Sequence, residues 1–466
     1  MCVSTATGCT APFQSLVGVK QGCPLSPNLF GLYVDDIERT LLADAAAMDM
    51  PCMHDGMPVP PLLYADDLVL LSTSPEGLQK QLDALHAYSS SWGLTVNAGK
   101  TKVVAFGRRR SAASLTDAGL VFTCGNDLLS IVDEFKYLGI QFHSSQAFCK
   151  AAAARAVSGK RAVHATRRRC TELGLLSPAL HIRMFNTMAL PVLSYGAEIW
   201  SPHLVAAGQE CDNTRVQMSF LRQMLGVRQS TSSLVVLAET GHRPLAVHWT
   251  LQLARFWNSI LASDEGSLVQ RALADSIALA GNAAGPLAQQ PWAAQFAAAM
   301  QSMSVPVDLQ APRQLRVGEV QESCTGWLLR QFAAAQGTKI RHYFNVVRGG
   351  VAEACLCPAE YLALLPQRAR RRALAQLRTG AHWLAEETGR WQRQERQQRI
   401  CVHCAALGQQ HIETVQHYIF ACPRTAALRE QYPQLFGDAA ASLAQFFGQD
   451  SVQLASFASA CYRLDH

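Results

Sequence analysis

The chain has 466 residues, of which 41 are Lys or Arg and 35 are Asp or Glu, so its formal net charge is +6. Hydrophobic residues make up 49% of the chain and charged residues only 16%, which excludes a disordered protein or an acidic tail. This length predicts about two or three domains. The first ten residues lack the basic and apolar segments of a secretory signal, so we expect an intracellular protein, nuclear or cytoplasmic.

No stretch of the sequence predicts a membrane span. The best candidate, Phe185–Trp200, is interrupted by Pro191 and Glu198, whereas a span needs about 18 or more apolar residues in a row. The 15 cysteines form an odd, scattered set. In a reducing compartment such residues are mostly buried or bind metal.

Residues 1–150 have mixed α+β character. Leu62–Tyr64 and Leu68–Leu71 are predicted strands on either side of a tight turn, and Gly77–Tyr88 has the apolar spacing of a helix. Gly93–Val96 and Lys102–Phe106 are further predicted strands. The first 150 residues are therefore interpreted as one domain.

From residue 151 onward the composition shifts to Ala, Gln, Leu and Arg, with apolar residues at helical spacing. We expect mainly helical regions at 151–280 and 281–395, a short Cys/His module at 396–425 and a C-terminal tail at 426–466. The predicted fold class is α+β for the whole chain, with a helical majority.

Two adjacent carboxylates, Asp66 and Asp67, lie at the predicted turn between the first two strands. Burial there would be costly, because each carboxylate would need a partner. At a hairpin tip they are suited to Mg²⁺, which takes a few carboxylate oxygens together with substrate phosphates and serves phosphoryl transfer. The alternative is an Asp-Asp turn that only exposes charge.

A second Asp pair, Asp35 and Asp36, follows a similar Tyr-Val dipeptide. The apolar spacing of Phe30, Val34 and Leu41 around it predicts a helix, on which successive side chains point about 100° apart. We interpret this pair as part of a solvated helix face.

Several motifs accompany the Asp66-Asp67 hairpin in a fixed order. Upstream is a Gly-Val-Lys-Gln-Gly-Cys-Pro-Leu-Ser-Pro segment at 18–27, and downstream are Gly-Leu-Thr-Val-Asn at 93–97, Lys-Thr-Lys at 100–102 and Phe-Lys-Tyr-Leu-Gly at 135–139. Together they resemble the palm of the reverse transcriptases of non-LTR (LINE-type) retrotransposons. The resemblance covers about residues 1–150.

The resemblance implies roles for individual residues. Asp66 would be the Mg²⁺ (or Mn²⁺) ligand, with Asp67 beside the primer end. Gln21, Gly22, Pro24 and Lys100 would face the nucleotide and template, and Phe135, Tyr137, Leu138 and Gly139 would support the primer. The residues alone leave other interpretations open. Gly22 would suit any turn with positive φ, and Lys100 could lie in any surface turn. Residues 135–139 could simply form a strand of the core.

The family also places an aspartate on a strand before the 18–27 loop, whereas Met1–Val17 contains no Asp or Glu. We therefore expect an N-terminally truncated palm without the fingers. The resemblance implies an RNA-directed DNA polymerase that uses an RNA template, a DNA primer or target and dNTPs. The alternative is a catalytically inactive truncated derivative that only binds RNA or DNA, or the product of a decayed reading frame.

Basic residues are concentrated just after the primer-support motif, in a stretch without an acidic residue. The set is Lys150, Arg155, Lys160, Arg161, Arg167, Arg168 and Arg169. On a helix it predicts salt-sensitive binding to a nucleic-acid backbone, and its position matches the thumb of the family that the chain resembles. The alternative is an ordinary solvated face. A second basic run, Arg390 to Arg399 around Trp391, is open to the same two interpretations.

Cys401, Cys404, His417 and Cys422 have the spacing of a structural Zn²⁺ site. His403 and His411 are competing candidates for the histidine ligand. The spacing predicts Zn²⁺ binding, and the cluster resembles the C-terminal CCHC module of LINE-type polymerases. The alternative is a group of reduced, buried cysteines.

Overall fold

The computed structural model describes the chain except for residues 1, 3, 7, 13–17, 20–21, 44–47, 108–110, 146–147, 209, 282–283, 366, 437–441 and 466. It divides into two compact units. The first comprises Met1–Tyr137 and Phe142–Gln146, and the second comprises Leu138–Gln141 and Ala147–His466. Among the described helices, none combines the length and the apolar composition that a membrane span requires.

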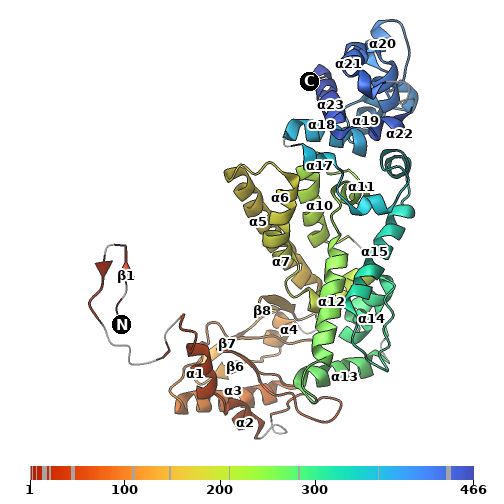
Figure 1. Cartoon of the computed structure of the whole chain (residues 1–466). Coiled ribbons are helices and arrows are strands. Elements are labelled where there is room, and N and C mark those ends of the chain that lie inside the picture. The colour runs from red at the N-terminus through yellow and green to blue at the C-terminus, as the bar shows by residue number, and fades with distance from the viewer. Residues whose placement is uncertain are drawn as a thin grey trace. The chain divides into compact units, whose positions relative to one another are not determined.

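The first unit combines short helices with small sheets, which confirms the predicted α+β class (Figure 1). The pairings are β1 with β2, β3 with β4, β8 with β9, and a three-stranded sheet in the order β5-β7-β6. Its elements are β1 (Ser4–Thr5), β2 (Gly8–Cys9), α1 (Ser26–Tyr33), α2 (Ile37–Leu42), β3 (Leu62–Tyr64), β4 (Asp67–Val69), α3 (Pro75–Ser91), β5 (Lys102–Val103), α4 (Ala112–Asp117), β6 (Phe122–Cys124), β7 (Asp127–Ile131), β8 (Glu134–Tyr137) and β9 (Ile140–His143). Residues 140–141 of β9 are counted with the second unit.

Helix α3 carries the two apolar clusters of the first unit. Leu85 and Tyr88 pack with residues of α2, and Leu82 packs with β6 and β7. The helix begins at Pro75, and the Ser74 hydroxyl caps it by accepting a hydrogen bond from the Gly77 amide at 3.0 Å. The predicted helix Gly77–Tyr88 lies inside this longer one.

Two predictions for the first unit were wrong. Gly93–Val96 forms no strand, and Val34 to Asp36 form a turn between α1 and α2, so the Asp35-Asp36 pair is not on a helix face. The Tyr88 hydroxyl donates to Asp36 Oδ1 at 2.5 Å, which ties this turn to α3. Burial, together with the neighbouring Asp36, raises the pKa of Tyr88.

The second unit is helical among its described residues. Its first half contains α5 (Cys149–Glu172), α6 (Pro178–Met184), the π-helical turn η1 (Phe185–Ala189), α7 (Leu190–Leu193), α8 (Ala197–Trp200), α9 (Pro202–Ala207), α10 (Asp212–Leu225), α11 (Ser233–Thr240), α12 (Leu245–Leu261), α13 (Leu268–Ala280) and η2 (Leu287–Gln289). Its second half contains α14 (Trp292–Ser302), α15 (Val317–Ala333), α16 (Thr338–His342), η3 (Tyr343–Val347), η4 (Glu353–Leu356), α17 (Tyr361–Leu364), α18 (Arg368–Thr379), α19 (Ala385–Trp391), η5 (Arg396–Gln398), α20 (Val402–Ala406), η6 (His417–Ala421), η7 (Pro423–Thr425), α21 (Ala426–Gln431), η8 (Pro433–Leu435), α22 (Leu443–Phe447) and α23 (Ser451–Asp465).

Two large apolar clusters hold the second unit together. One is centred on α12, where Trp249 and Trp257 pack with Trp200 and Phe296. The other joins η1, α10, α11 and α18 to the C-terminal helices, and α23 packs against α18 (Figure 1). Residues 426–465, which the sequence set apart as a tail, thus contribute helices to this core.

Candidate active site and metal centre

The two adjacent aspartates stand at the tip of a two-residue hairpin. Strands β3 and β4 are antiparallel, with Tyr64 paired to Asp67, so that Ala65 and Asp66 form the turn. Ala65 has φ +52°, a conformation typical of such tight turns. Both carboxylates are exposed, and carboxylate oxygens are the ligands that a hard cation such as Mg²⁺ prefers.

Tyr137, at the end of β8, lies within electrostatic range of this hairpin. Burial raises the pKa of the Tyr137 phenol, and the negative charge of Asp67 raises it further. The Tyr137 ring centre is 6.5 Å from that of Phe142 on the paired strand. One predicted primer-support residue is therefore close to one predicted catalytic residue.

Leu138 and Gly139 form the turn between β8 and β9. Unlike Tyr137, they pack within the second unit. Both have positive φ, +44° and +83°. The Tyr195 hydroxyl donates to the Leu138 carbonyl oxygen at 2.9 Å. A Cβ atom on Gly139 would lie 2.8 Å from the Tyr195 ring, so this position requires glycine for both its backbone conformation and its packing.

The predicted nucleotide-facing residues are less closely connected to the β3–β4 hairpin than Tyr137 is. Gly22 (φ +80°) and Pro24 lie in an exposed turn before α1, and Gln21 lies outside the described residues. Lys100 is exposed, and its amide donates to Asn97 Oδ1 at 3.1 Å in a local turn. Among the described residues no hydrogen bond or ion pair joins Gly22, Pro24 or Lys100 to either aspartate.

The basic stretch after the primer-support motif forms one long helix, α5. Small residues such as Ala152, Ala156 and Gly159 are buried, and a Cβ atom on Gly159 would lie 2.1 Å from Leu193 Cδ2, so α5 and α7 are in direct contact. The opposite face carries most of the predicted set, since Lys150, Lys160, Arg161, Arg167, Arg168 and Arg169 are exposed. Arg155 is half-buried, with its guanidinium 5.6 Å from the centre of the Tyr195 ring.

Glu172 is an acidic partner at the C-terminal end of this basic face. Glu172 pairs with Arg168 at 3.3 Å and with Arg169 at 3.6 Å. Lys160, Arg161 and Arg167 form no ion pair among the described residues, and positions 160 and 167 share one side of the helix because they are two turns apart. These three cations are available to a polyanion.

Cys401, Cys404, His417 and Cys422 converge, with one ligand atom of each lying within 4.8 Å of the others. The Sγ atom of Cys422 is 3.7 Å from that of Cys401 and 3.9 Å from that of Cys404, and His417 Nε2 is 3.3 Å from Cys404 Sγ. Two sulfurs at the 2.3 Å bond length of tetrahedral zinc would be about 3.8 Å apart, so the donors fit this ion.

The backbone around the cluster is fixed by hydrogen bonds. The Cys401 amide donates to the His411 carbonyl oxygen at 2.8 Å, and the Cys422 amide donates to the His417 carbonyl oxygen at 2.8 Å. The His411 ring stacks on that of His417, with centres 5.1 Å apart. Neither His403 nor His411 joins the group of four among the described residues.

The second basic run does not form a single helix. Helix α19 ends at Trp391 and the chain turns before η5, so Arg390 to Arg399 do not share a face. Arg399 donates to the carbonyl oxygens of Gln394 and Glu386, which makes it a structural residue.

Comparison with known proteins identifies the first unit. The family model described as "Reverse transcriptase (RNA-dependent DNA polymerase)" matches residues 3–142. Residues 3–142 belong to the reverse transcriptase family. They are related to the polymerases of non-LTR retrotransposons of the R2 and jockey types.

Three similar proteins show how far this relationship extends. The Pol polyprotein of the R2DM element of Drosophila melanogaster is 36% identical over 128 residues, which is 27% of this chain and 12% of that protein. The RNA-directed DNA polymerase from the mobile element jockey of Drosophila funebris is 27% identical over 237 residues, or 48% of this chain and 23% of that protein. The R2 Pol polyprotein of Popillia japonica is 32% identical over 206 residues, which is 42% of this chain and 30% of that protein. The matched regions thus cover less than a third of these three relatives.

The reverse transcriptase region was recognisable from local motifs, whereas Tyr195 was not. Tyr195 contacts both Leu138 and Arg155, yet it lies 57 residues beyond Leu138, in the turn between α7 and α8, where the sequence has no motif. Only the three-dimensional packing connects it to the primer-support turn.

Proposed function

We propose that this chain is a polymerase part of a non-LTR retrotransposon protein, and that it transfers dNTPs to a primer 3′-hydroxyl on an RNA template. In this reaction the hydroxyl oxygen forms a bond to the α-phosphorus, the bond to the bridging oxygen breaks, and pyrophosphate leaves. The observation that carries the proposal is the β3–β4 turn, which exposes Asp66 and Asp67 with Tyr137 nearby, inside a region of the reverse transcriptase family.

The residues have separate tasks in this proposal. The carboxylates of Asp66 and Asp67 would hold Mg²⁺ or Mn²⁺, for which exposed oxygen donors are suitable. When bound, Mg²⁺ supplies positive charge to the triphosphate and to the attacking oxygen. Tyr137, Leu138 and Gly139 would position the primer end, and the exposed face of α5 would bind the backbone of the duplex. Gln21, Gly22, Pro24 and Lys100 would face the template and the incoming nucleotide.

A specific observation favours nucleic-acid binding without synthesis as the second candidate. The described residues bring no third acidic, His or Cys side chain into a metal-binding group with Asp66 and Asp67. A two-metal site needs more ligands than this pair provides. Binding through α5 does not depend on a metal site at this hairpin.

We further propose that Cys401, Cys404, His417 and Cys422 hold one Zn²⁺ ion. Its role would be structural, because four protein ligands close a tetrahedral site and leave no position for a substrate. The metal would join α20 to η6 and to the residue that follows it, Cys422.

Primer extension tests the polymerase proposal. The purified chain is mixed with a poly(A) template, an oligo(dT) primer, dTTP and Mg²⁺ or Mn²⁺, and compared with an Asp66→Asn, Asp67→Asn variant. The matched control is Asp127→Asn, because Asp127 closes the β6–β7 hairpin opposite Cys124 as Asp67 closes its own hairpin opposite Tyr64.

Extension that the double variant abolishes and the control keeps is the expected result. If the chain shows no extension but binds the template in a salt-dependent way, the second candidate replaces the first.

A further inference from the structure

The turn between β8 and β9, which the proposed function assigns to primer support, is held by a residue outside the recognised motifs. Tyr195 donates its hydroxyl to the Leu138 carbonyl oxygen at 2.9 Å. A Cβ atom on Gly139 would lie 2.8 Å from the Tyr195 ring, so the ring packs on the second residue of the turn. All three residues belong to the second unit. One phenol side chain therefore contacts both residues of the turn.

The backbone at Tyr195 is tied to the core of the second unit. The Trp200 indole, which is fully buried, donates to the Tyr195 carbonyl oxygen at 2.9 Å. Trp200 packs in turn against Trp249 of α12, with ring centres 5.1 Å apart. Gly196 has φ +67°, and a Cβ atom on it would lie 2.7 Å from Ile140 Cδ1 on β9. Tyr195 thus links the turn to the apolar cluster centred on α12.

Leu138 is an unusual residue for this turn. Positive φ at both central residues, +44° at Leu138 and +83° at Gly139, is the pattern of a type I′ turn, which favours Asn or Asp before Gly. The Leu138 side chain is also 38% exposed. Neither the backbone conformation nor burial therefore explains a leucine at this position. Strained positions of this kind persist where the surrounding structure holds them, as Tyr195 does here, and they are concentrated at functional sites.

The ring of Tyr195 also holds a positive charge. The Arg155 guanidinium, on α5, lies 5.6 Å from the ring centre, which is within the range of a cation–π contact. Arg155 is half-buried and forms no ion pair among the described residues, and its Nε atom has no hydrogen-bond partner there. No carboxylate of the described chain therefore neutralises this charge, which suits a phosphate.

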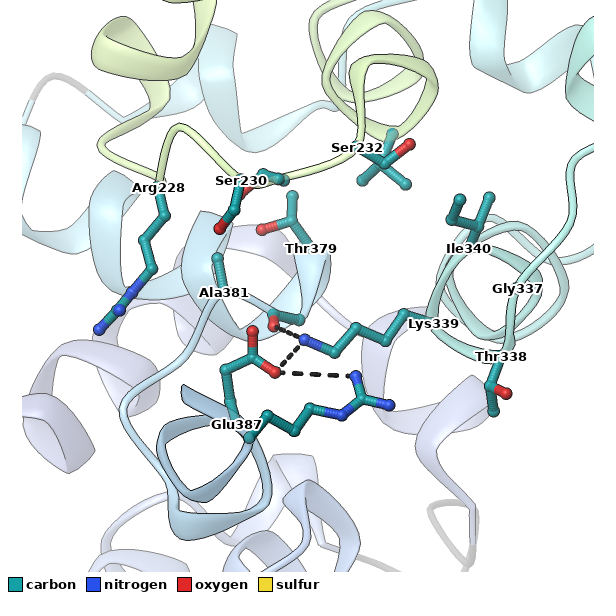
Figure 2. Close-up of a pocket in the computed structure, with 14 residues that line it drawn as sticks. Arg228, Ser230, Ser232, Gly337, Thr338, Lys339, Ile340, Thr379, Ala381 and Glu387 are labelled. Atoms are coloured by element: carbon teal, nitrogen blue, oxygen red, sulfur yellow. Dashed lines mark hydrogen bonds and ion pairs between the residues drawn. The ribbon is translucent and has the colours of Figure 1, made fainter. Parts of the chain in front are cut away.

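Neighbouring cations elsewhere in the second unit are held in a different way. Lys339 and Arg390 line a pocket of about 340 Å³ together with Glu387 (Figure 2). The Glu387 carboxylate contacts Lys339 and lies 3.9 Å from Arg390, so it offsets part of their charge. At Tyr195 an aromatic ring takes the place of the carboxylate, and the full charge of Arg155 is kept.

We propose that Tyr195 is a positioning residue for the end of the primer strand. Its hydroxyl holds Leu138 in the conformation that presents the leucine side chain to the sugar of the terminal nucleotide. Its ring places Arg155 beside the turn, where the guanidinium binds a phosphate of the same strand. The primer as ligand rests on the proposed function, whereas the contacts of Tyr195 do not.

Tyr195→Phe is the decisive variant, because it removes the hydroxyl and keeps the ring that contacts Gly139 and Arg155. Tyr33→Phe is the matched control. Tyr33 is 45% exposed and Tyr195 49%, and the Tyr33 hydroxyl also donates to a main-chain carbonyl oxygen, that of Trp92, at 2.6 Å. The probes are two fluorescent DNA–RNA hybrids, one with a recessed primer 3′ end and one in which a loop closes that end. Anisotropy measures the affinity of the chain for each hybrid.

We expect Tyr195→Phe to weaken binding of the recessed hybrid by about fivefold to tenfold and to leave binding of the closed hybrid unchanged. Tyr33→Phe should change neither affinity. A general structural defect would weaken the binding of both hybrids. Equal losses for the two hybrids, or an unchanged preference for the recessed one, would overturn the proposal.

Tyr195→Leu tests the role of the ring. Its loss releases Arg155, so we expect the slope of log affinity for the recessed hybrid against log salt to fall by about 0.7–0.9, or one phosphate contact, relative to Tyr195→Phe. The same slope in both variants would overturn the phosphate contact of Arg155. A wild type without preference for the recessed hybrid would refute the proposed primer site itself, and this role with it. Because the readout is binding, an inactive polymerase does not affect the result.

Discussion

Arg378 on α18 donates a hydrogen bond from Nε to Glu239 Oε1 on α11 at 2.7 Å, and both side chains are buried. The Tyr343 hydroxyl donates to the other carboxylate oxygen of Glu239 at 2.6 Å. Burial opposes the charged form of Glu239, but Arg378 and Tyr343 outweigh it, so the pKa of Glu239 is lowered. This buried pair joins α11 to α18.

Loss of the charge on Glu239 is expected to destabilise the second unit strongly. Glu239→Gln keeps the shape of the side chain but leaves the buried Arg378 cation without its counter-ion, which costs about 3–5 kcal/mol of unfolding free energy. Urea denaturation followed by circular dichroism measures this loss.

The matched control is Glu319→Gln, which removes a carboxylate 2.9 Å from Arg316 in an exposed pair. An exposed pair contributes about 0–1 kcal/mol. If both variants lost a similarly small amount of unfolding free energy, the result would contradict the burial of the Glu239–Arg378 pair.

Zinc is expected to bind at one ion per chain and to stabilise the region around 401–422. Cys404→Ser should abolish binding and expose this region to proteolysis, since the three buried cysteines form a small cluster separate from the main core. Metal content after dialysis and limited proteolysis with and without a chelator measure both effects.

Cys357→Ser is the control, because Cys357 is exposed and lies outside the cluster. A full zinc content in Cys404→Ser would show that the four residues do not form the site.

The sequence predicted those elements whose determinants are close together in the chain. The β3–β4 hairpin follows from two apolar runs around a tight turn, and the Cys/His cluster follows from the spacing of its ligands. In contrast, the turn at Asp36 is hydrogen-bonded to Tyr88, which is 52 residues away. The sequence therefore did not predict the turn at 34–36 that separates α1 from α2.

The same limit applies to the candidate sites. Asp66, Asp67 and Tyr137 belong to motifs with a recognisable order, whereas Tyr195 reaches the turn at Leu138 only through the folding of the second unit. The contact of its ring with Gly139 is a property of the folded chain alone. No pattern in the sequence could have indicated it.

Nucleic-acid binding is expected to depend on salt through the exposed face of α5. The variant Lys160→Gln, Arg161→Gln, Arg167→Gln removes three unpaired cations, and each lost phosphate contact reduces the slope of log affinity against log salt by about 0.7–0.9. Filter binding of single-stranded RNA at several salt concentrations measures the slope.

The control Arg255→Gln, Arg313→Gln, Arg316→Gln removes three exposed arginines from other parts of the second unit. If both triple variants lower the slope equally, net charge rather than the α5 face governs binding.

His382 is expected to make the second unit less stable in mild acid. Burial, with the positive charges of Lys339, His342 and Arg390, lowers its pKa to about 3. The unfolded chain takes up a proton on this imidazole below a pH of about 6.5, whereas the folded chain does not until about pH 3. The contribution of neutral His382 to the free energy of unfolding is therefore complete above a pH of about 6.5. It is lost as the pH falls, by up to about 1.4 kcal/mol per pH unit.

Urea denaturation of wild type, His382→Phe and His164→Gln at several pH values between about 5 and 7 tests this expectation. Phenylalanine fills a similar volume, and His382 Nδ1 has no hydrogen-bond partner among the described residues, so this variant should fold. Its stability should fall less steeply with decreasing pH than that of the wild type, whereas His164→Gln, on the exposed face of α5, should keep the wild-type slope. An unchanged slope in His382→Phe would mean that other histidines with lowered pKa values, such as the buried His203 and the half-buried His248, account for the acid sensitivity.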